Sequence, residues 1–248
     1  MMGKVEKYLH EKIQSDGCIH ITLLDPDKTS GYDCADIAQK AEAGGTAAIM
    51  VGGSTLASNS DLNEAVQRIK SKIDIPVILF PNGPSGVSEY ADAIWFMSLL
   101  NSSNSYYLID AQALSAPIVK RYGLEAIPMG YIIVGEGCVA GYVGHARLIQ
   151  YRHPQLAVGY SLAAESMGMR FVYLEAGSGA LEQVPPEMIG AVKKYLNIPL
   201  IVGGGIRSPG AALLAKKAGA DVIVTGTLVE ESSAVKERIY EIVNTIKD

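Results

Sequence analysis

Short apolar segments alternate with longer amphipathic segments along the whole chain. The apolar segments cover residues 18–25, 47–53, 76–82, 93–100, 126–134, 171–177, 199–205 and 221–227. Most of them are apolar at consecutive positions, which is typical of parallel strands buried on both faces. Helical spacing of apolar residues marks the segments at 34–43, 62–72, 186–195, 209–218 and 233–247. The pattern therefore predicts a regular alternation of strands and helices.

Residues at the segment boundaries support this interpretation. Asp33 and Asp61 stand where N-caps of two helices are expected, and Ser208-Pro209 is a typical helix start. Gly44 and Gly219 follow two helical segments, where glycine commonly ends a helix.

Alternation of this kind implies right-handed parallel crossovers between strands. Eight units in 248 residues fit a single TIM (β/α)8 barrel over residues 1–248, with an open doubly wound sheet as the alternative. Two crossovers depart from the repeat. Residues 83–92 are too few for a full helix, and residues 135–154 form a long, glycine-rich stretch. We expect a barrel modified at its third crossover, with an elaborated fifth loop.

Composition narrows the class of protein. Hydrophobic residues make up 48% of the chain, which excludes a disordered or collagen-like protein. The net charge of −5 disfavours nucleic acid as a partner. No apolar run reaches the ~18 residues of a membrane span, and the N-terminal segment does not resemble a secretion signal. Cys18, Cys34 and Cys138 lack metal or redox spacing, so we interpret them as reduced thiols of a soluble, cytoplasmic protein.

In a barrel, function is expected where the strands end at their C-terminal face. Asp25 closes the first strand, and an acidic residue there either binds a cation or substrate or belongs to a plain turn with Asp27. Ser54 follows Gly52-Gly53 at the end of the second strand, in what is either a ligand loop or a glycine-rich turn. A carboxylate and a hydroxyl from adjacent strands suit Mg²⁺ with open positions for phosphate oxygens.

Glu175 lies inside the sixth apolar segment and is followed by small residues up to Gly179. A carboxylate in this position is either the partner of a buried cation or a catalytic base whose pKa the site adjusts.

Glycine-rich loops follow the seventh and eighth strands, where TIM barrels usually bind phosphate through backbone N–H groups and a helix N-terminus. The residues concerned are Gly203, Gly204, Gly205, Gly226 and Thr227. A phosphate-binding site is the strongest functional conclusion from these residues alone.

Together, Leu24-Asp25-Pro26-Asp27, Gly52-Gly53-Ser54, the segment 173–179, Gly203 to Arg207 and Thr225-Gly226-Thr227 resemble the geranylgeranylglyceryl phosphate synthase family. These are archaeal prenyltransferases that make the first ether bond of membrane phospholipids, and they are related to bacterial heptaprenylglyceryl phosphate synthases. The resemblance covers essentially the whole chain. It implies a modified TIM barrel, sn-glycerol 1-phosphate as acceptor, geranylgeranyl diphosphate as donor, and Mg²⁺ as cofactor.

The resemblance also implies roles for individual residues. Asp25 and Ser54 would hold Mg²⁺ on the donor diphosphate, and the five residues of the two glycine loops would bind the phosphate of the acceptor. The glycerol phosphate would be surrounded by Tyr173, Leu174, Glu175, Ala176, Gly177, Ser178 and Gly179. The 3-hydroxyl would attack C1 of the allylic diphosphate, and Glu175 is our candidate for the base that takes its proton.

Other residues are less specific. Trp95, Phe96 and Met97 are either core residues or part of a lipid groove if they face outward at the barrel mouth, and Asn101 is a turn residue or a substrate contact. The four histidines have no metal-ligand spacing. The tyrosines at 106, 107, 131, 142 and 151 could form an apolar wall or a subunit contact, and we expect a homo-oligomer.

Two rival functions fit the same barrel. A phosphosugar isomerase or aldolase would use the same phosphate loops, but no lysine lies within the eight strand segments to form a Schiff base. A non-catalytic phosphate- or flavin-binding barrel would have little use for Asp25 and Glu175 near an anion.

Overall fold

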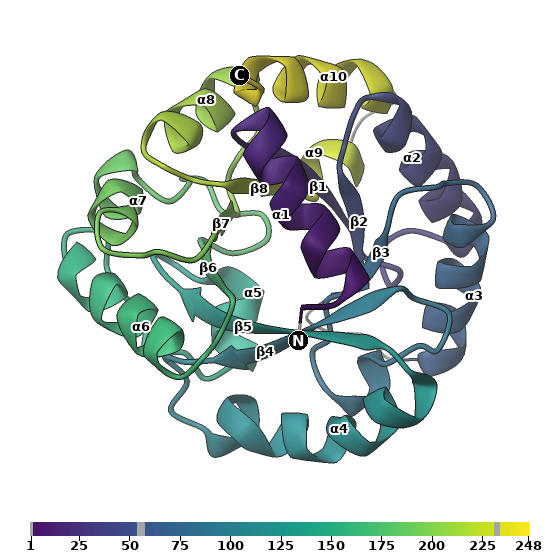
Figure 1. Cartoon of the computed structure of the whole chain (residues 1–248), viewed down its shortest axis with the longest axis horizontal. Coiled ribbons are helices and arrows are strands. Elements are labelled where there is room, and N and C mark those ends of the chain that lie inside the picture. Colours follow the sequence, from purple (N-terminus) through teal and green to yellow (C-terminus); the bar gives the residue numbers. More distant parts are fainter. Residues whose placement is uncertain (1, 54–57, 231–233) are drawn as a thin grey trace.

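The computed structural model describes residues 2–53, 58–230 and 234–248. Eight parallel strands pair in chain order, and the last pairs with the first to close a barrel (Figure 1). The strands are β1 (Ile19–Leu24), β2 (Ala48–Val51), β3 (Val77–Leu79), β4 (Ala93–Leu99), β5 (Glu125–Ile133), β6 (Phe171–Glu175), β7 (Leu200–Gly203) and β8 (Val222–Thr225). Each lies within one of the eight apolar segments or extends it by one residue, so the predicted TIM barrel is confirmed.

Helices surround the barrel and lie at its ends (Figure 1). They are α1 (Lys4–Asp16), α2 (Gly31–Ala43), α3 (Asn59–Lys70), α4 (Ala111–Tyr122), α5 (Cys138–Val143), α6 (Pro154–Ser166), α7 (Pro186–Lys193), α8 (Pro209–Lys217), α9 (Thr227–Glu230) and α10 (Val235–Ile246). Among the helices that the structure describes, the seven that surround the barrel are α2, α3, α4, α6, α7, α8 and α10, while α1, α5 and α9 lie at its ends. None of the described helices is long and apolar enough to cross a bilayer.

The third crossover is shortened, as the sequence predicted. Between β3 and β4 the chain forms only a single 3-10 turn, η1 (Pro84–Gly86). The fifth loop is elaborated by α5 before the chain reaches α6. Both irregular segments begin at the C-terminal ends of their strands. They therefore start at the same end of the barrel.

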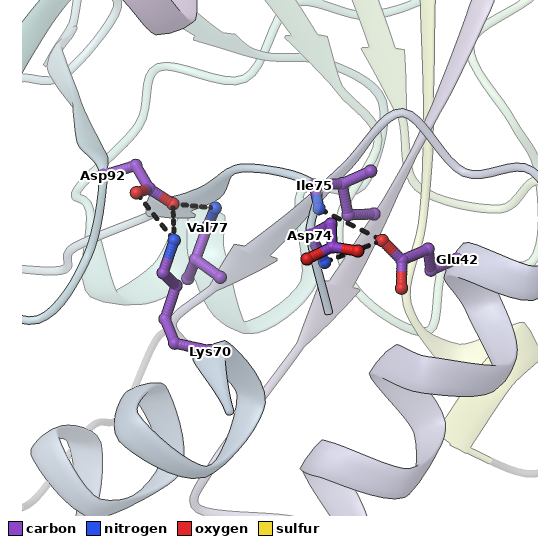
Figure 2. Close-up of polar contacts among 6 residues, drawn as sticks. All are labelled: Glu42, Lys70, Asp74, Ile75, Val77 and Asp92. Carbon is purple, nitrogen blue, oxygen red and sulfur yellow. Dashed lines mark hydrogen bonds and ion pairs between the residues drawn. The ribbon is translucent and has the colours of Figure 1, made fainter. Parts of the chain in front are cut away.

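Two carboxylates fix the start of the short strand β3 (Figure 2). Oε1 of Glu42 on α2 accepts the backbone N–H groups of Asp74 and Ile75 at 2.9 and 3.1 Å. Oδ2 of Asp92 accepts the Val77 N–H at 2.8 Å and pairs with the Lys70 ammonium. These side-chain acceptors satisfy backbone N–H groups where the chain enters β3.

Two helices begin earlier than predicted. The N-caps are Ser30 for α2 and Ser58 for α3, and each serine side chain accepts the N–H of the residue three positions later. Those later residues are Asp33 and Asp61, so the predicted caps actually lie in the first turn. A carboxylate there is still favourable, because it faces the positive end of the helix dipole.

Side chains of the strands alternate between the barrel interior and the helix layer. The interior cluster includes Ile21, Met50, Trp95 and Phe171, all almost completely buried. Two further apolar clusters lie between the strands and the helices. Because both faces of the strands are covered, the apolar segments show no polar–apolar alternation.

Helix α1 lies across the N-terminal end of the barrel (Figure 1). Val5 and Leu9 belong to the interior cluster, and the Glu125 carboxylate accepts the N–H groups of Val5 and Glu6 at 2.7 and 2.8 Å. Residue 3 is a glycine, and a Cβ there would collide with that carboxylate. The helix therefore covers one end of the barrel interior, and the cavities described below open at the other.

Candidate active site

A cavity of about 480 Å³ lies at the C-terminal ends of the strands. The predicted site residues that line it are Asp25, Tyr173, Glu175, Ser178, Gly179, Gly204, Gly205, Gly226 and Thr227. Leu174 and Ala176 are fully buried in the layer between strands and helices, because they alternate with Tyr173 and Glu175 along the strand. The sequence thus correctly predicted where the cavity lies, but it did not predict which side chains of the segment 173–179 point into it.

Glu175 is a buried carboxylate at the end of β6. Its Oε1 accepts the Gly177 N–H at 2.6 Å, and the Tyr173 hydroxyl also donates to the carboxylate. Burial raises the pKa of Glu175 above its ordinary value, against the lowering effect of these two hydrogen bonds. Among the described residues it forms no ion pair that would neutralise it, so the interpretation as the partner of a buried cation is not supported.

Three aromatic rings form the floor beneath Glu175, and we call them the aromatic floor: Phe80, Tyr131 and Tyr173. The Phe80 ring centroid lies 5.5 Å from that of Tyr131 and 5.8 Å from that of Tyr173, and the two tyrosine rings are 5.3 Å apart. Tyr131 and Tyr173 are register partners on β5 and β6. A Cβ at Gly203 would collide with the Tyr173 hydroxyl, so a glycine there makes room for the ring.

Asp25, directly after β1, lines the same cavity. Its Oδ1 accepts the Asp27 N–H at 3.1 Å, and its Oδ2 lies 3.3 Å from the Lys28 ammonium. A Cβ at Gly53 would fall within 2.5 Å of both carboxylate oxygens, so the glycine lets the Asp25 carboxylate pack directly against the chain after β2. Ser54, the second predicted metal ligand, lies outside the described residues.

The glycine loops after β7 and β8 enclose the same cavity. Gly204 and Gly205 have φ of +83° and +73°, a region that favours glycine. A Cβ at Gly204 would lie 2.6 Å from Glu175 Oε1 and 2.7 Å from the Gly177 nitrogen, so the two loops pack backbone against backbone. Ser208 caps α8, as predicted, by accepting the N–H of Ala211. This arrangement of small residues can bring N–H groups close to a phosphate.

A buried histidine contacts the last residue of β8, directly before the glycine loop. His20 on β1 lies 2.9 Å from the Thr46 and Thr225 hydroxyls through its two ring nitrogens. Complete burial lowers the pKa of His20 to about 3, so its ring is neutral at pH 7. Thr225 directly precedes Gly226, so this contact helps to fix where the loop begins.

A second cavity adjoins the first and is mainly apolar, and we call it the apolar groove. It lies among β4, the loop after β3, α4, and α5 with the residues that follow it, and its residues include Trp95, Phe96, Met97, Tyr107 and Ala111. Gly53, Phe80, Tyr131 and Ala140 line both cavities. The molecule therefore offers a polar site with carboxylates and glycine loops, continuous with an apolar groove.

Comparison with known proteins identifies the family. The PcrB family model matches residues 9–246. The chain belongs to the PcrB family. Geranylgeranylglyceryl phosphate synthases from Thermofilum pendens and Thermococcus kodakarensis are each 51% identical to it, over 100% and 99% of this chain and 97% and 98% of their own. The chain is thus also a member of the geranylgeranylglyceryl phosphate synthase family, and the resemblance found in the sequence is confirmed.

A solved structure of a PcrB-type relative has the same fold. It is the (S)-3-O-geranylgeranylglyceryl phosphate synthase from Thermoplasma acidophilum, in complex with its substrate sn-glycerol-1-phosphate. The TM-score is 0.95 at 45% identity, and the match covers 100% of this chain and 99% of the other.

The structure decides two alternatives that the sequence left open: Trp95 is a core residue, and Asn101 is a turn residue. Trp95 faces the barrel interior, not outward, yet it still lines the apolar groove because the groove reaches into the barrel. Asn101 is fully buried and hydrogen-bonds to backbone groups of Ile133 and Arg147, so it holds the loops after β4 and β5 together. No cluster of three or more metal-ligating side chains occurs within the described ranges.

Among the residues that line the cavity enclosed by the glycine loops of this PcrB barrel, the sequence-based argument gave no site role to Lys28, Phe80 or Arg207, and it named Tyr131 only as part of an apolar wall or a subunit contact. Besides its contact with Asp25, the Lys28 ammonium lies 3.4 Å from Ser178 Oγ, and Nη2 of Arg207 donates to the Gly179 carbonyl at 3.3 Å. Phe80 directly follows β3, so the strand-end rule that selected Asp25 would also have selected it. Tyr131 lies within a strand and gave no such signal.

Proposed function

We propose that the chain transfers the geranylgeranyl group of geranylgeranyl diphosphate to the 3-hydroxyl of sn-glycerol 1-phosphate, forming an ether and releasing diphosphate. The observation that carries this proposal is the continuity of the two cavities. A small polar phosphate would use the glycine loops, while a long apolar chain would use the groove between β4 and α4. The complex of the Thermoplasma acidophilum relative with sn-glycerol-1-phosphate supports the choice of acceptor.

The acceptor end of the reaction rests on the loops after β6, β7 and β8. Backbone N–H groups at Gly204, Gly205 and Gly226 would bind the phosphate. The glycerol would be surrounded by the residues of the segment 173–179 that line the cavity, which are Tyr173, Glu175, Ser178 and Gly179. Arg207, which also lines the cavity, supplies a positive charge near the phosphate.

Glu175 is the residue best placed to take the proton of the 3-hydroxyl. Oε1 is engaged by the Gly177 N–H, which fixes the orientation of the carboxylate. A raised pKa makes this carboxylate a stronger base than an exposed glutamate, which suits proton removal near neutral pH. The proton leaves the hydroxyl as its oxygen bonds to C1 of the donor.

The donor end would use Asp25 and the apolar groove. Mg²⁺ in proteins is commonly held by one or two carboxylates together with substrate phosphates, and Asp25 presents such a carboxylate to the cavity that the glycine loops line. Bound there, Mg²⁺ would neutralise charge on the departing diphosphate. Asp25 would hold the ion, with Ser54 as the second ligand that the family resemblance suggests.

The test is direct. The purified protein is incubated with labelled geranylgeranyl diphosphate, sn-glycerol 1-phosphate and Mg²⁺, and the product is analysed by mass and chirality. We expect label in a glycerol phosphate ether, loss of turnover with a chelator, and recovery with added Mg²⁺. Absence of transfer under these conditions would overturn the proposal, and turnover unaffected by the chelator would overturn the Mg²⁺ assignment.

We also propose a homo-oligomer in the cytoplasm. Large apolar side chains are exposed on the outer side of the barrel, among them Ile109, Leu114, Leu156 and Met167. Such residues are common at contacts between subunits. The cysteines at 18, 34 and 138 are free, which agrees with a reducing compartment. Light scattering on the purified protein measures the assembly, and fractionation of the source cells measures the compartment.

A further inference from the structure

The junction of the two cavities defines where the reacting carbon of the donor lies, if the proposed function holds. The diphosphate would lie towards Asp25 and the apolar chain in the groove. The carbon that joins them must pass the four residues that line both cavities. Two of these, Gly53 and Ala140, have no functional side chain, and the other two, Phe80 and Tyr131, are aromatic.

These two rings are held in place before any ligand binds. Phe80 and Tyr131 meet edge to face, and both pack against Tyr173 below them. Tyr131 is 7% exposed and Tyr173 only 1%, so neither tyrosine ring can turn without disturbing the barrel interior. Phe80 is half-buried and is held by its contacts with both tyrosines. The rings thus present fixed aromatic surface to the junction.

The chemistry at the junction develops positive charge. The C1–O bond breaks with its electron pair leaving on the diphosphate, and the allylic carbons carry the positive charge until the 3-hydroxyl oxygen donates an electron pair to C1. The hydroxyl proton then goes to the Glu175 carboxylate. An aromatic face attracts a cation through its quadrupole, and it offers no oxyanion that would compete with the hydroxyl for C1.

We propose that Phe80 and Tyr131 are catalytic residues that stabilise the positive charge of the allylic group in the transition state. Tyr173 is a positioning residue that supports both rings and donates to Glu175. Each ring contributes about a 10- to 30-fold rate increase, which corresponds to a cation–aromatic contact of ~1–2 kcal/mol.

The test compares two unreactive analogues of the prenyl group, one carrying an ammonium in place of the allylic carbon and the other its neutral isostere. Binding of each is measured by calorimetry with inorganic pyrophosphate and Mg²⁺ present. Wild-type protein should bind the ammonium analogue more tightly than the neutral one. Phe80→Leu should lose about tenfold of this preference and about tenfold in kcat, with little change in KM for the donor.

Matched variants separate charge from shape. Phe171→Leu makes the same change deeper in the barrel, away from both cavities, and should keep the preference for the ammonium analogue. Tyr131→Leu should lose that preference, whereas Tyr131→Phe, which keeps the ring, should retain it. If Phe80→Leu does not fold, the comparison of Tyr131→Leu with Tyr131→Phe tests the inference on its own.

Equal weakening of both analogues in Phe80→Leu and Tyr131→Leu would overturn the inference, because it would mean that the rings contribute shape alone. This outcome differs from failure of the proposed function, in which the wild-type protein itself would form no labelled ether.

Discussion

The backbone N–H of Gly177 donates at 2.6 Å to Oε1 of Glu175, which lies two residues earlier in the chain. The bond requires the chain to turn immediately after β6, and Gly177 has φ of +109°, which other residues rarely adopt. A Cβ at this position would also meet Cys138 at 2.8 Å. The glycine at position 177 is therefore explained by the tight turn and by the hydrogen bond that orients the Glu175 carboxylate.

Glu175→Gln should lower kcat by roughly 10²- to 10⁴-fold, the usual contribution of a positioned general base. The amide keeps the size of the side chain but cannot take a proton. In the wild-type enzyme, kcat should fall on acidification at a pH above the ordinary glutamate value of 4.5, because the pKa of Glu175 is raised. Steady-state rates across pH measure both effects.

The control for this variant is Glu187→Gln, an exposed position on α7 that makes the same chemical change. It should retain the wild-type rate and pH profile. A Glu175→Gln enzyme that turns over at a near-normal rate, with its substrates bound normally, would rule out the role of Glu175 as base.

Gly203→Ala should displace the Tyr173 ring, which lies beneath Glu175. The added Cβ would lie 2.1 Å from the Tyr173 hydroxyl, so the tyrosine must move and its hydrogen bond to Glu175 would be lost. We expect a loss of about 1–3 kcal/mol in the free energy of unfolding, typical of overpacking, and a clear decrease in kcat. Chemical denaturation and steady-state kinetics measure the two.

Gly159→Ala on α6 provides the comparison, because an added Cβ there meets nothing within 4 Å. It should leave activity unchanged and slightly stabilise the helix. Gly203→Ala with wild-type stability and turnover would contradict the packing argument.

The fold was largely predictable because buried parallel strands leave an unmistakable signal. The sequence-based segment 93–100 coincides with β4 to within one residue, and the short stretch after β3 correctly indicated the reduced crossover. Helix starts were less accurate. Asp33 and Asp61 suggested caps, but Ser30 and Ser58 accept the first free N–H groups, and the acidic residues follow in the first turn.

The candidate site was predictable only where polar or glycine residues stand at strand ends. Asp25, Glu175 and the two glycine loops meet in one cavity, as expected. The aromatic floor was not foreseen. Consecutively apolar strands show no alternation, so nothing local distinguishes Tyr131, which faces inward, from Leu174, which faces outward. That Phe80, Tyr131 and Tyr173 converge depends on the pairing of strands far apart in sequence.

The buried His20 should make the fold sensitive to acid. Its pKa is about 3 in the folded state and near 6.5 when unfolded, so below pH 6.5 the unfolded chain binds a proton that the folded one does not. Stability is therefore fully present above pH 6.5 and is lost as the pH falls towards 3. Between pH 7.5 and 5.5 this residue alone should lower the free energy of unfolding by roughly 1.4 kcal/mol.

Denaturation at the two pH values in the wild type and in His20→Gln measures this contribution. We expect the variant to be less stable at pH 7.5, because the Thr46 and Thr225 hydroxyls lose the two ring nitrogens that they contact. Its free energy of unfolding should change less than that of the wild type between the two pH values. His153→Gln, at the start of α6, should keep the wild-type dependence. An unchanged pH dependence in His20→Gln would contradict the assignment.

The groove between β4 and α4 should limit the length of the donor chain. Ala111 on α4 is 8% exposed and lines this groove, so Ala111→Phe would fill part of it with a ring. We expect kcat/KM for a 20-carbon diphosphate to fall about 10- to 100-fold, equivalent to the ~1–3 kcal/mol cost of overpacking, while a 10-carbon diphosphate reacts nearly as before. Ala116→Phe, exposed on the same helix and outside the groove, should change neither rate. Equal losses for the short and long donors in Ala111→Phe would show that the apolar chain lies elsewhere, because only a chain that reaches Ala111 can be sensitive to its size.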